Sequence, residues 1–512
     1  MDHIYSFNKS DNFIHFISIH KKGLNLSISS IIMEEMDFIN YRQIHYPKLS
    51  LPLYNDEGDL LIGWWRPQIW RATCYYAYTM AKIIHDHIIA IIESKLNGGP
   101  FKNFLLLSND NAFLNQPPFY FEQRTLLAGF IAQYQISRNN ISMPVFIKKP
   151  VYGAFCLLSY LGNTIFFSPP ISESANSAFS LNHGWDAISH GIHLNEVEMI
   201  NYNYSFKKHA TRLDEKDDFF ILPTISVYLV SDESNQSQNI LFQIALLYGC
   251  LKHDVINVYL QNEPFHILST ILTNALSYTP SNKLPFIREY ILPQVKLVLY
   301  VSLAIYVVND NLTNPYSTWM QMQRPTVLSH EQITELRKVE GHRRIKLVTK
   351  KVSLSKLLLQ ENNYIEISSS IFRYIFKNLT ITEGYSCPGL VLYHVCFYNP
   401  LFRRINTIVP FNIFIQPILS LFFLLKWDLL IYDNEDKNKI ACLKTFEIHY
   451  SFMKGHNKSW TVYEVKNDIL INSLELDFSE YENVDFIFVK IRIIDHWNKR
   501  GPFSKIYFWY RS

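Results

Sequence analysis

The feature that most limits the fold of this chain is a succession of a short apolar run, a polar tip and a helical stretch, found three times in the first 137 residues. The apolar runs are residues 13–19, 51–54 and 104–107, and helical spacing follows at 34–45, at 75–96 and from Gln123 onward. Residues 150–160 read as a further helix. Parallel strands need such crossovers, and their carboxyl ends then share one edge, so we predict part of a parallel α/β fold. Three units are too few to close an eight-stranded barrel.

From about residue 166 the pattern changes to β-branched and aromatic runs separated by polar turns, which predicts an antiparallel β-sandwich with one short helix at 329–339. These runs are residues 221–230, 240–247, 255–260, 295–308 and 390–396. From about residue 404 the pattern predicts a second, smaller β-sandwich. Its strands are expected at residues 419–427, 445–452, 460–463, 486–494 and 505–510. We therefore expect three domains, 1–165, 166–403 and 404–512.

Composition excludes several classes of protein. With 48% hydrophobic and 15% aromatic residues the chain is globular, and a net charge of +3 predicts no bulk attraction to nucleic acid or membrane. Charged or polar residues interrupt the apolar runs 295–308 and 413–430, so we expect buried strands rather than membrane spans. The sequence contains no CxxC pair of the kind that binds zinc, and we expect no metal or organic cofactor. The N-terminus lacks the pattern of a signal peptide.

The stretch 51–70 carries the strongest functional signal. An apolar entry leads into Asn55, Asp56, Glu57 and Asp59, and then into Gly63 and two tryptophans. Carboxylates beside indole faces suit a sugar, because an aromatic face packs on a pyranose ring and a carboxylate can attack its anomeric carbon. An acidic surface turn is the alternative, since Asn, Asp and Gly are ordinary turn residues.

Several segments, taken in order, resemble the α-L-iduronidase family, which comprises lysosomal retaining glycosidases of clan A. They include ISIHKKG (17–23), LYNDEGDLLIGWWRPQIWRA (53–72), LLSNDNAFL (106–114), EQRTLLAGF (122–130) and VKIRIIDHWNKRGPFS (489–504). The resemblance implies a fold: the C-terminal part of a (β/α)8 TIM barrel, about strands six to eight, followed by a β-sandwich and a fibronectin type III-like domain.

The resemblance also implies roles for individual residues. Glu57 matches the catalytic nucleophile, and Lys22 and Arg124 would supply cations for the carboxylate of a uronic acid. Alone, each residue type more often serves a structural role, such as a turn aspartate or an arginine on a helix surface. The substrate-binding residues implied are His20, Lys22, Gly63, Trp64, Asp110 and Arg124.

The cysteines divide into two groups. The resemblance implies a disulfide between Cys396 and Cys442, which would join the sandwich to the C-terminal domain. The other four are expected to be free and buried, as small hydrophobic residues. They are Cys74, Cys156, Cys250 and Cys387.

The chain departs from the family pattern in one respect. Family members carry their general acid/base in an Asn-Glu-Pro motif upstream of the nucleophile, and nothing upstream of Glu57 matches it. The tripeptide 262–264 has this sequence, but it lies in the predicted sandwich and is interpreted as a chance match. We therefore expect the chain to begin just before the sixth barrel strand and, as written, to be inactive.

Two functions are carried forward. The first is a lysosomal enzyme that removes non-reducing terminal α-L-iduronic acid from dermatan and heparan sulfate. The second is a non-catalytic glycan-binding or interaction protein derived from such an enzyme. The partner expected in both cases is a glycosaminoglycan, with no nucleic acid and no membrane span. Homodimerisation and the order of residues 168–219 are left open.

Overall fold

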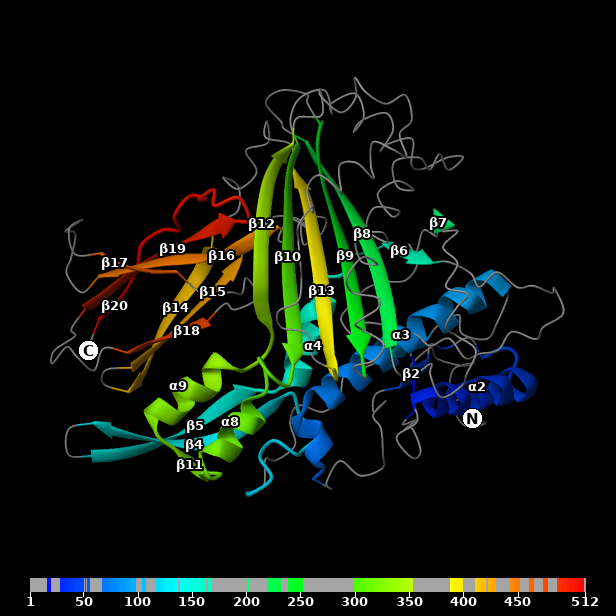
Figure 1. Cartoon of the computed structure of the whole chain (residues 1–512), viewed down its shortest axis with the longest axis horizontal. Helices are drawn as coiled ribbons and strands as arrows, with labels where there is room; N and C mark the ends of the chain where they lie inside the picture. Colours follow the sequence, from blue (N-terminus) through cyan, green and yellow to red (C-terminus); the bar gives the residue numbers. More distant parts are fainter. Residues whose placement is uncertain are drawn as a thin grey trace.

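The structure is a computed structural model (Figure 1). The described residues are 16–19, 28–49, 51, 53–55, 67–97, 104–106, 117–136, 139–162, 164–167, 200–201, 219–231, 238–251, 299–352, 387–398, 410–419, 422–429, 442–451, 460–464, 473–477 and 486–510.

The N-terminal region contains the parallel sheet that the sequence predicts. Strands β1 (Ile17–Ile19), β2 (Leu53–Asn55) and β3 (Phe104–Leu106) pair in the order β1-β2-β3, and both pairings are parallel. Helix α2 (Ile28–His45) connects β1 to β2, and the long helix α3 (Cys74–Asn97) connects β2 to β3. The apolar residues of α3 recur every three or four positions and are buried, so the helix forms on an extended hydrophobic face.

The helix predicted from Gln123 onward is wrong. Strands β4 (Leu127–Ile136) and β5 (Asn139–Lys148) form an antiparallel hairpin there, and β11 (Val327–Leu328) pairs with β4 in parallel. The buried residues Ala128, Phe130 and Ala132 alternate along β4, which is the period of a strand. They pack with Trp319 of α8 (Pro315–Gln321) and with residues of α9 (His330–Lys338), a tertiary contact that outweighs the helical propensity of the segment.

A seven-stranded sheet forms the centre of the molecule, with the strand order β12-β10-β13-β9-β8-β6-β7. Its pairings are antiparallel except for the parallel pair β6–β7. The described residues of this region form one sheet, so the sandwich predicted for residues 166–403 remains a prediction. The strands are β6 (Thr164–Phe167), β7 (Ile200–Asn201), β8 (Phe219–Ser231), β9 (Gln238–Cys250), β10 (Leu299–Asn309), β12 (Arg343–Val352) and β13 (Gly389–Tyr398).

Helices α3 and α4 (Pro150–Ser159) pack against this central sheet. Their buried side chains form one continuous core with those of β8, β9, β10 and β13. Gly153 of α4 lies so close to the backbone of Gly341 that an added Cβ would be 2.3 Å from the Gly341 carbonyl oxygen. The N-terminal α/β region and the central sheet therefore share a core, and the domain boundaries at residues 165/166 and 403/404 remain predictions.

The C-terminal region is a small β-sandwich, as predicted. One sheet has the order β14-β15-β18, and the other has the order β17-β16-β19-β20. Trp427 packs edge-on against Phe446 of the facing sheet at 5.1 Å, and Phe423 packs against Trp509 at 4.6 Å. The strands are β14 (Pro410–Leu419), β15 (Phe422–Leu429), β16 (Leu443–Ser451), β17 (Thr461–Glu464), β18 (Ser473–Asp477), β19 (Phe486–Asp495) and β20 (Tyr507–Tyr510).

The cysteine predictions are confirmed in part. Cys396 and Cys442 form the expected disulfide, and Cys74 and Cys156 are free and buried. The prediction that Cys250 and Cys387 are free is wrong, because they form a second disulfide. Register explains this pair: Cys250 at the end of β9 lies opposite Gly389, two residues after Cys387, which brings the two Cα atoms to 5.5 Å.

The two apolar runs weighed as membrane spans form strands where they are described, in β10, β14 and β15. Among the described residues, no helix has the length and apolar character needed to cross a bilayer.

Candidate active site

The parallel register of β1, β2 and β3 brings three chain segments to one edge of the sheet. Ile19, Asn55 and Leu106 lie opposite one another at the carboxyl ends of the three strands. His20, Glu57 and Asp110 follow these positions by one, two and four residues. These three residues, together with Lys22, Gly63 and Trp64, lie outside the described residues, so their roles remain predictions.

A buried polar network lies directly beneath this edge. The Asn55 amide donates to Glu35 Oε1 on α2, and His87 Nε2 on α3 lies 2.6 Å from Glu35 Oε2. His87 Nδ1 donates to the carbonyl oxygen of Ile83 at 2.9 Å. Glu35, Asn55 and His87 are all buried.

Electrostatics in this network favour a charged imidazole. Burial alone lowers the pKa of His87, but the adjacent Glu35 carboxylate, helped by the Ile83 carbonyl, outweighs that effect and raises the pKa. With both ring nitrogens donating, His87 forms a buried ion pair with Glu35. The last residue of β2, two positions before Glu57, is thereby tied to both flanking helices.

The sequence gives no sign of this network. Glu35 is 20 residues from Asn55 and 52 residues from His87, and the three residues form no motif. A glutamate and a histidine inside amphipathic helices ordinarily read as surface positions. Only the packing of α2 and α3 on β2 brings them together.

Arg124 is the one predicted substrate-binding residue that the structure describes. It is buried in the turn before β4 rather than on a helix surface. The flanking residues of this turn are fixed: the Gln68 N–H donates to the Glu122 carbonyl at 2.9 Å, and Lys149 Nζ donates to the Gln123 carbonyl at 2.7 Å. An arginine stays charged at any pH that proteins meet, so its burial requires acceptors or anions nearby.

Two further buried cations lie in segments joined to this turn. Arg71 is on the short helix η2 (Ile69–Ala72), with its guanidinium carbon 5.2 Å from the Trp70 ring. Lys149 Nζ is 5.6 Å from the ring of Tyr76. Neither cation is among the predicted site residues, although Arg71 falls within the segment 53–72 that carries the family resemblance. Together with Arg124 they place three buried cationic side chains in these adjoining segments.

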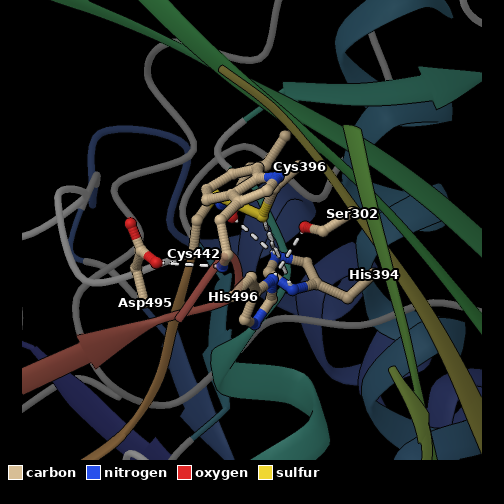
Figure 2. The surroundings of a disulfide bond; sticks show 8 residues. Ser302, His394, Cys396, Cys442, Asp495 and His496 are labelled. Carbon is tan, nitrogen blue, oxygen red and sulfur yellow. Dashed lines mark hydrogen bonds between the residues drawn. A yellow bond between two sulfur atoms is a disulfide. The ribbon is translucent and has the colours of Figure 1, made fainter. Parts of the chain in front are cut away.

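A second polar cluster surrounds the Cys396–Cys442 disulfide (Figure 2). Ser302 Oγ is hydrogen bonded to His496 Nδ1 at 2.9 Å, which is the spacing of a serine nucleophile and its base. The cluster is nevertheless structural. Ser302 and His496 are buried, and the neighbouring Asp495 carboxylate accepts from the backbone N–H groups of Trp497 and Lys499 rather than from the imidazole.

Burial dominates the protonation of this cluster. It lowers the pKa of His394 to about 4 and that of His496 well below its usual value, so both imidazoles are neutral at physiological pH. Burial raises the pKa of Asp495 to about 6, although the two backbone donors oppose that change. Within the described residues, no group of three His, Cys, Asp or Glu side chains is arranged to hold a metal ion.

Comparison with known proteins identifies the relatives of the chain. Residues 2–213 match glycosyl hydrolases family 39. The mouse α-L-iduronidase is 25% identical over 498 residues, which cover 96% of this chain and 60% of the mouse protein. Human α-L-iduronidase is 39% identical over 149 residues, covering 29% of this chain and 22% of the human protein. The chain thus spans about 60% of the length of its mouse relative.

Among solved structures, a bacterial orthologue of human α-L-iduronidase aligns with 98% of this chain and 65% of its own length, at 16% identity and a TM-score of 0.49. That score is too low to carry an argument about function. The sequence relationships confirm the resemblance to α-L-iduronidases, and the match to glycosyl hydrolases family 39 covers the N-terminal residues 2–213.

Proposed function

We infer that this relative of the α-L-iduronidases contributes the nucleophile-bearing part of a retaining glycosidase that acts on non-reducing terminal α-L-iduronic acid in dermatan and heparan sulfate. The observation that supports the proposal is the register of β1, β2 and β3, because it brings to one sheet edge the carboxyl ends of the three strands after which the predicted site residues follow in sequence. In parallel α/β folds the functional groups collect at this edge.

In the proposed reaction, Glu57 attacks the anomeric carbon of the iduronyl residue while the bond to the leaving oxygen breaks. The resulting ester between Glu57 and the sugar is then hydrolysed by water, and the two inversions give net retention of configuration. Leaving-group departure from a natural glycoside also needs a proton donor, which contributes roughly 100-fold to 10,000-fold in rate.

Recognition of a uronic acid follows from charge. A uronate carboxylate requires cations or hydrogen-bond donors at its binding site, and Lys22 and Arg124 are proposed to provide them. Arg71 and Lys149 support this assignment as buried positive charges in the segments around the Arg124 turn. Asp110 is proposed to accept hydrogen bonds from ring hydroxyls, and His20, Gly63 and Trp64 to line the sugar site.

The Glu35–His87–Asn55 network has a part in this proposal. A nucleophile must be held close to its productive geometry, and Asn55 is anchored to two helices just before Glu57 in the chain. The proposed location, following the relatives, is the lysosome. A non-catalytic glycan-binding protein remains the alternative function.

Hydrolysis of a synthetic iduronide tests the proposal without requiring a proton donor. The predicted inactivity follows from the missing general acid, which natural glycosides need. Dinitrophenolate leaves without protonation, so this chain should still cleave dinitrophenyl α-L-iduronide if its nucleophile and sugar site are intact. Glu57→Gln should abolish cleavage, and Asp59→Asn, a matched change in the same stretch, should preserve it. No cleavage by the parent chain, or equal cleavage by the Glu57 variant, would refute the nucleophile assignment. A natural disaccharide substrate in the same assay decides whether the chain also supplies a general acid.

A further inference from the structure

The outer face of the C-terminal sheet β17-β16-β19-β20 combines exposed aromatic rings with cations. Along β19, Ile487, Val489, Ile491 and Ile493 are buried in the module core. The intervening residues, at positions 486, 488, 490 and 492, therefore point to the opposite face. They span about 20 Å of strand.

One end of this face is aromatic. Phe486 lies opposite Tyr510, and Phe488 lies opposite Phe508, so four rings share one face of the β19–β20 pair. Phe486 is 52% exposed, Phe508 64% and Tyr510 57%. Exposed aromatic rings that lie side by side mark interaction surfaces, because soluble proteins rarely expose large contiguous apolar patches without a function.

The other end is cationic, and ring contacts hold its charges in place. Lys490 Nζ lies 4.5 Å from the ring of Trp460 and 4.4 Å from that of Phe503. The guanidinium carbon of Arg492 lies 4.3 Å from Phe503. Such contacts fix a cation on the surface without cancelling its charge. Arg500, whose side chain is 60% exposed, adds a third positive group to this end.

Positive charge is concentrated in this part of the chain. Residues 486–512 contain six Lys or Arg and one Asp, whereas the whole chain has a net charge of only +3. Glu447 is buried and accepts from Arg492 and Arg500, and Glu464 of β17 lies opposite it in the register, so the positive charge of this end is partly offset. Burial opposes ionisation of Glu447, but hydrogen bonds from His449 and Arg492 and the charges of Arg492 and Arg500 outweigh it and lower the pKa of this carboxyl.

We propose that this face, the β19–β20 face, binds a sulfated glycosaminoglycan chain as an accessory polymer site. The aromatic rings would pack on the C–H faces of pyranose rings, and the fixed cations would pair with sulfate and carboxylate groups. The proposal takes its ligand class from the proposed function, because aromatic rings and cations also suit single-stranded nucleic acid.

The C-terminal module that carries this face lies apart from the parallel sheet (Figure 1). Figure 1 shows the C-terminal module on one side of the long central strands, with α2 and β2 on the other. A polymer held there and at the carboxyl edge of the parallel sheet would be bound at two places, which raises the effective concentration of its end.

Calorimetric titration of the full chain with a heparin-derived octasaccharide tests the proposal. Two double variants probe the two ends of the face: Lys490→Gln with Arg500→Gln, and Phe508→Ser with Tyr510→Ser. Each should weaken binding about tenfold, which corresponds to about 1.4 kcal/mol. The matched control, Lys338→Gln, removes one exposed cation from α9 and should change affinity less than twofold.

Four outcomes would overturn the proposal. The first is that the parent chain does not bind the octasaccharide, and the second is that the Lys338 control loses as much affinity per charge removed as the cationic double variant. The third is that the aromatic variant keeps full affinity. The fourth is that the chain binds a single-stranded oligodeoxynucleotide more tightly than the octasaccharide. Where the Lys490 double variant does not fold, Arg500→Gln and Phe508→Ser are compared singly, since both side chains are largely exposed. The test measures affinity at the β19–β20 face and requires no turnover, so failure of the nucleophile assignment leaves it unaffected.

Discussion

The neutral, buried His394 should make the stability of this protein depend on pH in a measurable way. Its Nε2 donates to Gln243 Oε1 at 2.7 Å, and the rings of Tyr160 and His496 pack against it at 5.4 and 5.9 Å. None of these groups is an anion that could stabilise an imidazolium. Its pKa is accordingly lowered to about 4 by burial.

The sign and size of the effect follow from this value. In the unfolded chain, His394 binds a proton as pH falls below about 6.5. In the folded chain it stays neutral until pH reaches about 4, so acid favours unfolding between these two values. The full difference corresponds to about 3 kcal/mol, of which about 2 kcal/mol develops between pH 7 and pH 4.5. Asp495, with its raised pKa of about 6, acts in the opposite direction.

Urea unfolding at these two pH values isolates the contribution of His394. Between about pH 7 and pH 4.5, the free energy of unfolding should fall by about 2 kcal/mol more in the parent chain than in His394→Gln, because glutamine cannot take up the proton. His45→Gln, at the exposed end of α2, is the control and should lose as much as the parent. Equal losses in the parent and in His394→Gln would refute the assignment of a buried neutral imidazole.

Three further predictions concern stability and are each checked by denaturant unfolding. Glu35→Gln should lower the free energy of unfolding by about 3–5 kcal/mol, because it leaves a buried imidazolium without its counter-ion. Asp37→Asn, exposed on the same helix, should change it by no more than about 0.5 kcal/mol. Similar values for the two variants would contradict the ion pair. Replacing Cys396 and Cys442 by serine should cost about 4 kcal/mol, the loop-closure value for their separation of 46 residues, and an unchanged midpoint would contradict that. Ser329→Ala should cost about 1 kcal/mol, since it removes the capping box of α9; no loss would show that the cap contributes nothing.

The elements that the sequence predicts correctly are those with a strong local pattern. Helix α3 was expected at 75–96 and runs from Cys74 to Asn97, because its apolar residues recur at helical spacing throughout. Strand β4 was mistaken for a helix because Leu, Ala and Gln favour helices locally, while its real period becomes visible only when β5 pairs with it. The small C-terminal sandwich was found because its strands are short, alternating and separated by clear turns.

The candidate site divides in the same way. Its motif residues are predictions that rest on the family resemblance, and of the predicted substrate-binding residues only Arg124 is among those the structure describes. The residues that support them could not be named from the sequence. Glu35 meets His87 only through helix packing, and Cys250 meets Cys387 across a separation of 137 residues. Such contacts depend on tertiary pairing, which no local pattern encodes.

Covalent trapping tests the central claim most directly. A fluorinated iduronyl fluoride carries a leaving group that needs no proton, and its fluorine slows hydrolysis of the glycosyl ester, so the ester accumulates on the nucleophile. Mass spectrometry of the digested chain should find one iduronyl adduct, on the peptide that contains Glu57, and none in Glu57→Gln. An adduct on another residue, or an unmodified chain in which the parent fold is intact, would contradict the assignment of Glu57 as nucleophile.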